Sequence, residues 1–227
     1  MLIVTKFSGE TMDQLIKRIK EEYNFNKIAY TARLDPMARG LVPLLIDDEC
    51  KNIKTHLIKS KVYQVKIIFG VQTDSDDPLG IITNKILIDT LIQNNYNDYF
   101  ELTDYKFQQK YHYFSTKMLN HRLKKNFTEA SHQVTIYKSE IIDNGILEYN
   151  KWSTKIISKI NSIDKTKNFR QEETIKQWTK LSIDKLPYIK LRLHVSSGFF
   201  VRQFIRDTSV KIGCPLMAYD IHRVLVL

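Results

Sequence analysis

Residues 31–40 read TARLDPMARG and place one carboxylate, Asp35, between a leucine and a proline. Because Pro36 disfavours the helical region for the residue before it, Asp35 is expected on an extended or turning loop. Arg33 and Arg39 flank this acid, and guanidinium groups both hold a nearby carboxylate ionised and bind phosphates. The segment is compatible with an anionic nucleophile presented to a polyanionic substrate, and equally with an Asp-Pro turn whose arginines are solvated.

The composition is that of a globular protein with a basic surface. The chain has 227 residues, of which 43% are hydrophobic and 26% charged, enough for one large or two small domains. Lys and Arg number 35 against 25 Asp and Glu, a formal net charge of +10. Cations that neutralise phosphates release condensed counterions, so this charge favours a polyanionic partner. Charge alone does not separate RNA from DNA or from an anionic membrane.

Several classes of protein are disfavoured by what the sequence lacks. Its two cysteines, Cys50 and Cys214, have no paired spacing and no histidine cluster around them, which argues against a zinc site or a disulfide framework. The apolar run at the N-terminus is too short for a signal peptide, and no later run approaches a membrane span. We expect no metal, no membrane contact and a cytoplasmic or other reducing compartment, with organellar and viral sources left open.

Hydrophobic periodicity predicts a mixture of helices and strands. Residues 12–23 place Leu15, Ile16, Ile19 and Tyr23 on one face of an amphipathic helix. The turn residues of VQTDSDDPLG, 71–80, predict an exposed loop. Because no regular βαβ repeat is present, the pattern favours an α+β fold with a largely antiparallel sheet. The other predicted strands are 41–46, 62–69, 133–142, 188–195 and 220–227, and the other predicted helices are 86–96, 149–160, 172–180 and 200–212.

The segment 144–186 is rich in Lys and Asn and contains both tryptophans, Trp152 and Trp178. Its two helical patterns are weak. It is either an insertion packed on the body of the protein or a mobile basic arm.

Four blocks, in order, resemble the TruB family of RNA pseudouridine synthases. AYTARLDPMARGLVP at 29–43 is similar to the catalytic loop GHTGTLDPLATGVLP of that family. KVYQVKIIFGVQTDSDDPLG at 61–80 resembles its Lys-x-Tyr strand and TDT-x-D-x-x-G loop, and VTIY recurs at 134–137. SSGFFVRQFIRDTSVKIGC at 196–214 resembles the block SKGTYIRSLAEDLGEALGC.

The resemblance implies a pseudouridine synthase fold, with a mixed, mostly antiparallel sheet flanked by helices around a central RNA-binding cleft. It implies a cofactor-free isomerisation of uridine to pseudouridine, with the T-loop uridine of tRNA, position 55, as the leading substrate. A stacked uridine is unreachable, so such an enzyme must hold the RNA backbone while it extracts the base, which accounts for the basic charge. The expected partner is the T-arm of tRNA, and the expected state is a monomer without an obligate protein partner.

The resemblance also assigns catalytic roles. Asp35 stands at the nucleophile, which attacks either the base or the sugar carbon. Arg202 stands at the arginine that pairs with the aspartate and keeps it ionised. Tyr63 matches the tyrosine expected to stack on the flipped base and to take the proton from the carbon that receives the sugar. Without the resemblance, Arg202 would be interpreted as an exposed arginine on a helix, and Tyr63 as a strand residue that packs in the core or against a neighbouring strand.

Five further residues are expected to bind the substrate. Ile221 falls where an aliphatic residue walls the uracil pocket, and Phe200 where the family has a tyrosine. Tyr30 replaces the histidine that contacts the flipped-out RNA, and a tyrosine ring can still stack on a base. Arg33 and Arg39 would contact phosphates.

The sequence also departs from the family pattern. Ala29, Ser197 and Phe199 replace its glycine, lysine and threonine, and QKYHYFST at 109–116 lacks both prolines of QxPPxYSA, which puts the rigidity of that loop in question. We expect one catalytic domain, 1–227, with a basic insertion at about 144–186 and no C-terminal PUA domain, and hypothesise that the insertion replaces some RNA contact. A solvated insertion without an RNA role is the simpler alternative. The alternative function is a catalytically weak or inactive RNA-binding protein or RNA chaperone.

Overall fold

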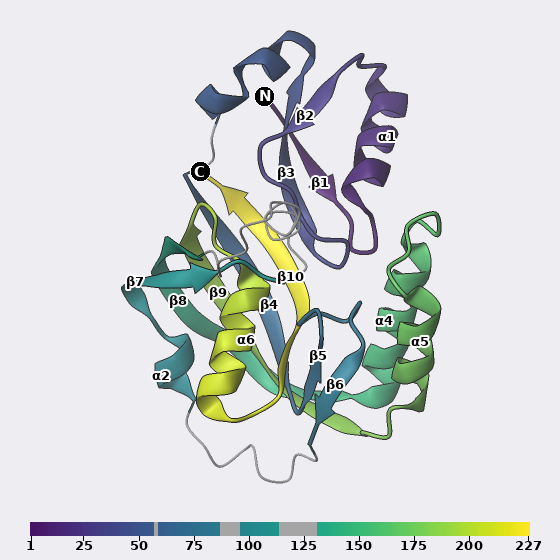
Figure 1. The fold of residues 1–227 in the computed structure, drawn as a ribbon, viewed down its shortest axis with the longest axis vertical. Helices are drawn as coiled ribbons and strands as arrows, with labels where there is room; N and C mark the ends of the chain where they lie inside the picture. The colour runs from purple at the N-terminus through teal and green to yellow at the C-terminus, as the bar shows by residue number, and fades with distance from the viewer. Residues whose placement is uncertain (57–58, 87–95, 114–130) are drawn as a thin grey trace, which may run out of the picture.

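An eight-stranded sheet forms the centre of the computed structural model, which describes residues 1–56, 59–86, 96–113 and 131–227 (Figure 1). The strand order is β1-β3-β10-β4-β9-β8-β7, with β2 paired to β3. Strands β3 and β10 pair in parallel, and the other pairs among the described residues are antiparallel. The mixed, mostly antiparallel α+β fold is therefore confirmed. The strands are β1 Leu2–Lys6, β2 Ile28–Tyr30, β3 Arg39–Ile46, β4 Ser60–Phe69, β7 Thr103–Lys110, β8 Ser131–Glu148, β9 Lys185–Ser196 and β10 Leu216–Val226.

A two-stranded sheet and several helices surround the central sheet (Figure 1). None of the helices in the described part of the chain is long and apolar enough to cross a membrane. These elements are β5 Val71–Thr73, β6 Ile82–Lys85, the 3-10 helix η1 Asp47–His56, and the α-helices α1 Met12–Tyr23, α2 Asn97–Phe100, α4 Tyr149–Ser162, α5 Gln171–Lys180 and α6 Val201–Ile212.

Helix α1 begins at a capping box. Thr11 Oγ1 accepts from the Gln14 backbone N–H at 3.1 Å, and Gln14 Oε1 accepts from the Thr11 N–H at 2.8 Å. The helix ends at Asn24, which adopts the left-handed conformation. The predicted helix 12–23 is thus confirmed at both ends.

Two apolar clusters stabilise the fold. The first lies between the sheet and helices α1 and α6, with Leu15, Ile67, Leu193 and Ile205 fully buried. The second lies under α4 and α5, where the rings of Trp152 and Trp178 meet edge to face with centroids 5.5 Å apart. Helices α4 and α5 therefore form a hairpin, residues 149–180, that packs on the body of the protein, so the packed alternative holds for these residues and the mobile arm does not.

The periodicity located most elements within a few residues of their observed bounds. The strands predicted at 62–69, 133–142 and 188–195 correspond to β4, β8 and β9, and the helices at 172–180 and 200–212 to α5 and α6. The strand predicted at 41–46 lies in β3 and the helix predicted at 149–160 lies in α4, and the strand predicted at 220–227 overlaps β10, which ends at Val226. Most of the helix predicted at 86–96 lies outside the described residues.

The prediction of an exposed loop at residues 71–80 is wrong. Asp76 and Asp77 are 0% and 3% exposed, which makes them interior groups. The α4–α5 hairpin covers the loop: Trp178 Nε1 donates to the Pro78 carbonyl at 2.8 Å, and Thr174 Oγ1 donates to the Leu79 carbonyl at 3.2 Å. Turn-forming residues predict a change of direction, but their burial depends on partners almost a hundred residues away.

Candidate active site

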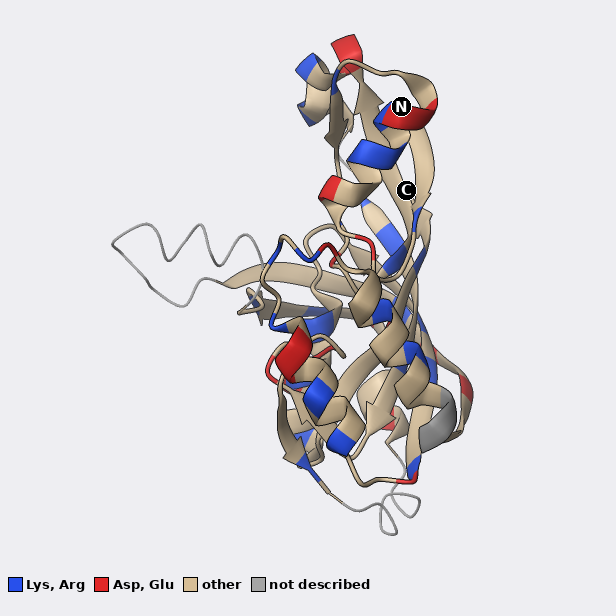
Figure 2. Cartoon of the chain, turned by 90° about the vertical axis from the view of Figure 1, so that its right-hand side faces the viewer, with Lys and Arg blue, Asp and Glu red and all other residues tan. Residues whose placement is uncertain are grey.

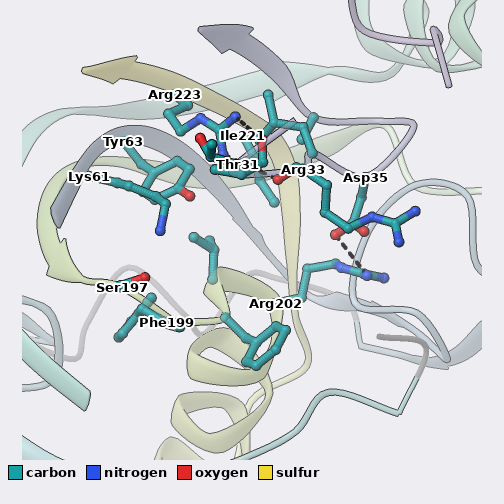
Figure 3. Close-up of a pocket in the computed structure, with 16 residues that line it drawn as sticks. Thr31, Arg33, Asp35, Lys61, Tyr63, Ser197, Phe199, Arg202, Ile221 and Arg223 are labelled. Atoms are coloured by element: carbon teal, nitrogen blue, oxygen red, sulfur yellow. Dashed lines mark hydrogen bonds and ion pairs between the residues drawn. The ribbon is translucent and has the colours of Figure 1, made fainter. Parts of the chain in front are cut away.

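A cavity of about 270 Å³ opens between the loop that carries Asp35, the start of β4, the loop before α6, and β10 (Figure 3). Six of the eight predicted site residues line it, although they come from four separate parts of the sequence. These residues are Arg33, Asp35, Tyr63, Phe200, Arg202 and Ile221.

An ion pair joins two of these residues. Arg202 Nη2 lies 2.8 Å from Asp35 Oδ2. The arginine side chain is 8% exposed whereas the carboxylate is 41% exposed, so the acid is accessible and its partner is not. Burial alone would raise the pKa of Asp35, but the positive charges of Arg202 and Arg33 outweigh it and hold that pKa below its usual value. The carboxylate is therefore ionised at neutral pH.

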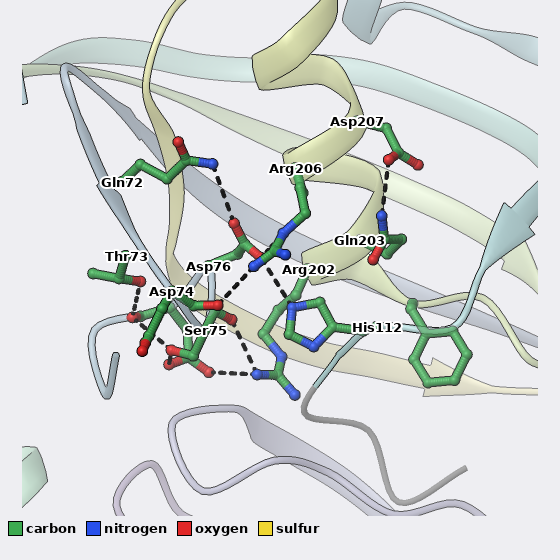
Figure 4. A network of polar contacts seen from close by, with 12 residues as sticks. Gln72, Thr73, Asp74, Ser75, Asp76, His112, Arg202, Gln203, Arg206 and Asp207 are labelled. Atoms are coloured by element: carbon green, nitrogen blue, oxygen red, sulfur yellow. Dashed lines mark hydrogen bonds and ion pairs between the residues drawn. The ribbon is translucent and has the colours of Figure 1, made fainter. Parts of the chain in front are cut away.

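The loop 71–80 holds the other side of the Arg202 guanidinium (Figure 4). Nη1 donates to the Ser75 carbonyl at 3.0 Å and lies 3.4 Å from Asp77 Oδ2. Asp77 in turn accepts from Ser75 Oγ at 2.8 Å and from the Leu79 N–H at 3.0 Å. Arg202 is thus fixed between two carboxylates, one buried and one open to the cavity. Asp77 was not predicted as a site residue, although it occupies the last acidic position of the TDT-x-D-x-x-G resemblance.

A buried polar cluster lies beside this loop (Figure 4). His112 Nε2 and Arg206 Nε are 2.9 Å and 2.6 Å from Asp76 Oδ2, and both His112 and Asp76 are fully buried. Burial, together with the positive charge of Arg202, lowers the pKa of His112 far below its usual value. The ring is therefore neutral, with Nε2–H donating to Asp76.

The segment 109–116, in which the missing prolines put rigidity in question, is anchored by polar contacts where the structure describes it. Gln109 Nε2 donates to the Phe200 carbonyl at 3.0 Å, and the Phe200 N–H donates to Gln109 Oε1 at 2.8 Å. His112 provides a second anchor. Residues 114–116 lie outside the described residues.

Two buried cations fix the backbone of the loop that carries Asp35. Lys6 Nζ donates to the Ala38 carbonyl at 2.7 Å and to the Pro36 carbonyl at 3.2 Å. Arg223 donates to the carbonyls of Leu41, Ala32 and Arg33 at 2.6, 2.9 and 3.2 Å. Sequence reasoning missed both residues, because nothing in their local pattern distinguishes them from surface cations.

Gly40 explains how β10 approaches this loop so closely. Its φ is +115°, and a Cβ added there would lie 2.1 Å from the Arg223 carbonyl oxygen. A larger residue would displace the strand that carries both Ile221 and Arg223.

The walls of the cavity suit a flat ring. Tyr63 on β4 and Ile221 on β10 are each 6% exposed, and Leu34 and Phe199 add apolar surface. Burial raises the pKa of Tyr63, so its phenol is protonated at neutral pH. A protonated phenol can pack on a base and donate a hydrogen bond, but it is a weak proton acceptor.

Tyr30 and Arg39, which were also predicted to bind substrate, do not line the cavity. Tyr30 is half-buried at the end of β2, with the Arg33 guanidinium 6.0 Å from its ring centroid. Arg39 pairs with Asp220, at 3.0 Å between Nη2 and Oδ2, so the carboxylate that it holds is not Asp35. Within the described residues, no group of three or more His, Cys, Asp or Glu is placed to hold a metal ion.

Known proteins resemble the chain in sequence and in fold. Residues 20–159 match the model of the TruB family pseudouridylate synthase N-terminal domain. The tRNA pseudouridine synthase B of Ureaplasma parvum is 26% identical over 94% of this chain and 80% of that protein. The enzyme of the same name from Blochmanniella pennsylvanica is 25% identical over 100% of this chain and 74% of that protein.

Among solved structures, a Cbf5-Nop10-Gar1 complex contains a chain with a TM-score of 0.55 and 13% identity, covering 99% of this chain. An archaeal Nop10-Cbf5 complex gives a TM-score of 0.54, also at 13% identity. The present chain spans about half the length of these solved chains, 48% and 47%. At this identity the likeness shows a shared fold.

Proposed function

Because the chain belongs to the TruB family of pseudouridylate synthases, and is therefore an isomerase that acts on RNA, we propose that it converts the T-loop uridine of tRNA, position 55, to pseudouridine. The observation that carries this proposal is the accessible, ionised carboxylate of Asp35 paired with the buried guanidinium of Arg202. The bacterial relatives that cover most of the chain are named as tRNA enzymes, which supports tRNA as the substrate.

The reaction breaks the bond between ribose C1′ and uracil N1 and forms a bond between C1′ and uracil C5, while C5 loses a proton and N1 takes one up. The base must turn while the sugar stays held, and no net oxidation occurs. Asp35 is the proposed nucleophile, attacking either C1′ or the base, and it leaves again when the new bond forms. Covalent attachment to Asp35 fixes one fragment, the sugar or the base, and the walls of the cavity must hold the other while the base turns.

The remaining cavity residues take supporting roles in this proposal. Arg202 keeps Asp35 ionised and oriented, and Asp77 holds Arg202 in place. Tyr63 packs against the uracil ring, with Ile221 and Phe200 as further walls. The raised pKa of Tyr63 favours packing and hydrogen bonding over proton abstraction at the start of the reaction.

RNA binding rests on cations spread around the cavity. Arg33 lines it, whereas Tyr30 and Arg39 lie outside it and are retained as proposed contacts to the flanking RNA. Figure 2 shows Lys and Arg along α1 and the α4–α5 hairpin, on the face at the right of Figure 1. Extracting a base costs a few kcal/mol, which contacts to the RNA backbone must offset.

The decisive experiment incubates the protein with unmodified T-arm RNA and with total cellular RNA, followed by pseudouridine mapping at nucleotide resolution. Wild type should form pseudouridine at the T-loop uridine, and Asp35→Asn should form none. Asp98→Asn, an exposed acid on α2, is the matched control and should retain full activity. Wild type without product, or equal product from Asp35→Asn, would reject the proposal. Product at another uridine would correct the substrate and leave the chemistry standing.

A further inference from the structure

A second, larger cavity of about 450 Å³ adjoins the first at Asp35 and Arg202. Five parts of the chain line it: the start of α1, residues 33–36, the loop that contains Ser75 and Asp77, the turn of the α4–α5 hairpin at 167–170, and Arg202 on α6. Its size falls in the range of small-molecule sites. The proposed reaction at Asp35 accounts for only one of the two cavities that meet there.

The lining of the second cavity combines apolar walls with charged groups of both signs, four of them cations and three of them carboxylates. Met12, Leu34, Pro36, Leu79 and Phe169 provide the apolar surface. Arg33 and Lys167 are exposed cations among the lining residues. A nucleotide complements this lining, because its flat base can pack on the apolar walls and its negatively charged phosphate can pair with the cations.

The hairpin side of the cavity is held firmly in place. Arg170 makes a bidentate contact with Asp74, at 2.7 Å and 3.0 Å, whereas Lys167 Nζ makes only an exposed pair with Asp13 Oδ2, at 3.1 Å, which is easily exchanged. At the other end of the turn, Gly9 packs so closely on α4 that an added Cβ would lie 2.1 Å from Ser162 Oγ. Phe169 is half-buried at the edge of the apolar cluster under the hairpin. A ring on a docked turn needs little ordering before it stacks on a ligand.

We propose that this cavity is a second nucleotide subsite, which takes the nucleotide bonded directly to the target uridine. The inference rests on the proposed function, because it requires the uridine to occupy the first cavity. The RNA chain is continuous, so a nucleotide next to the target must lie just outside the reactive cavity, and the second cavity begins there, at Asp35 and Arg202. Its base stacks on Phe169, and Lys167 exchanges its exposed pairing with Asp13 for a phosphate. The α4–α5 hairpin thereby contributes directly to RNA recognition.

The test measures binding of T-arm stem-loop RNAs to the full-length protein. Three RNAs are compared: the intact stem-loop, and stem-loops with an abasic nucleotide on the 5′ or the 3′ side of the target uridine. Phe169→Ala should weaken binding of the intact RNA about tenfold, within the range of loss of one stacked base. One of the abasic RNAs should bind wild type as weakly as the intact RNA binds Phe169→Ala. The Phe169→Ala substitution should not weaken the binding of that abasic RNA any further. That RNA identifies which neighbour occupies the subsite.

Three controls keep the test specific. Phe169→Leu retains apolar packing without an aromatic ring and should also weaken binding, whereas Tyr99→Ala, an exposed aromatic on α2, should not. Lys167→Gln should reduce the slope of log affinity against log salt by about 0.7 to 0.9, the change for one phosphate. Lys180→Gln, an exposed cation at the end of the same hairpin, should leave that slope unchanged.

Unchanged binding by Phe169→Ala, an equal loss on all three RNAs, or the absence of measurable wild-type binding would each overturn the subsite. Because affinity is measured without turnover, this result is separate from the activity result. Wild type that binds with the predicted dependence on Phe169 but forms no pseudouridine would refute the proposed function and leave the base-binding cavity established.

Discussion

The Asp35 carboxylate depends for its charge chiefly on the guanidinium of Arg202. Burial would raise its pKa above the usual value of 3.8, and the cations around it, Arg202 foremost, reverse that effect. In Arg202→Met we therefore expect the pKa of Asp35 to rise above 3.8. The carboxylate would then lose its charge as the pH falls through the raised value, a range in which wild type stays ionised. Titration of the Asp carboxyl carbons by ¹³C NMR measures this shift.

Arg18→Met is the control for that titration. Arg18 also forms an ion pair, with Glu10 at 2.9 Å, but it is not among the residues that line the cavity. The Asp35 signal should titrate in this variant as it does in wild type. If Asp35 still titrated below 3.8 in Arg202→Met, another cation would be holding its charge.

Single residues show where sequence reasoning succeeds and where it stops. Asp35, Tyr63 and Arg202 could be placed together because each sits in a recognisable block, and the structure brings all three to one cavity. Lys6 and Arg223, which bind the backbone of the same loop, could not be placed there from the sequence. The identity of a lysine or arginine does not reveal whether its side chain is buried or on the surface. Their partners are backbone carbonyls, which leave no trace in the sequence.

The α4–α5 hairpin contacts the loop 71–80 through a buried hydrogen bond. Removing this bond tests how much the contact contributes to the free energy of unfolding. Thr174 Oγ1 donates to the Leu79 carbonyl, and Thr174→Val removes the donor while keeping the shape. A buried carbonyl left without its partner costs about 1–3 kcal/mol, so the free energy of unfolding should fall by that amount in urea denaturation. Thr179→Val on the exposed side of α5 should change it by less than about 0.5 kcal/mol. Equal effects of the two substitutions would mean that the hairpin does not stabilise the loop through this contact.

The helices of the hairpin were predictable and their docking was not. Local periodicity in residues 149–160 and 172–180 reports an apolar face but does not say what that face covers. Its partners, including Met37 and Leu79, lie two residues beyond Asp35 and Asp77 in the chain. The same long-range contacts explain why the loop 71–80 is buried although its composition predicts exposure.

At the scale of the whole molecule, the α+β class could be predicted from a mixture of helix and strand patterns without a regular βαβ repeat. The order of the strands in the sheet could not be predicted from these patterns. Strand β10 lies between β3 and β4, pairing parallel with the first and antiparallel with the second. This arrangement brings the last strand against the loop after Tyr30 and against Tyr63. Segments from near both ends of the chain therefore line the same cavity. Local pattern carries no information on such pairings, whereas the resemblance to a family does, because it implies the whole topology at once.

Buried titratable groups also link the stability of the whole molecule to pH. Burial lowers the pKa of His112 in the folded state. Below the usual pKa of 6.5, the unfolded chain therefore binds a proton at His112 that the folded chain does not bind. The contribution of His112 is therefore fully present above pH 6.5 and is lost progressively below it, at up to about 1.4 kcal/mol per pH unit. The positive charges of Arg202 and Arg206 also oppose protonation of the ring, whereas the negative charge of Asp35 favours it. Asp76, whose pKa burial raises to about 6, has the opposite effect between pH 3.8 and 6.

We therefore expect His112→Asn, whose side-chain amide can still donate to Asp76, to be less stable than wild type at pH 7.5 but to lose less stability on acidification. Urea denaturation between pH 7.5 and 6 measures this, because the opposing effect of Asp76 on stability develops mainly below its pKa of about 6. His56→Asn, in the 3-10 helix at the opposite end of the sheet order from His112, should retain the wild-type slope. An unchanged slope in His112→Asn would mean that folding does not shift the pKa of His112, and a greater loss of stability on acidification than in wild type would mean that folding raises that pKa and that the folded chain holds the proton. The neutral hydrogen bond assigned to the His112–Asp76 contact would then be an ion pair.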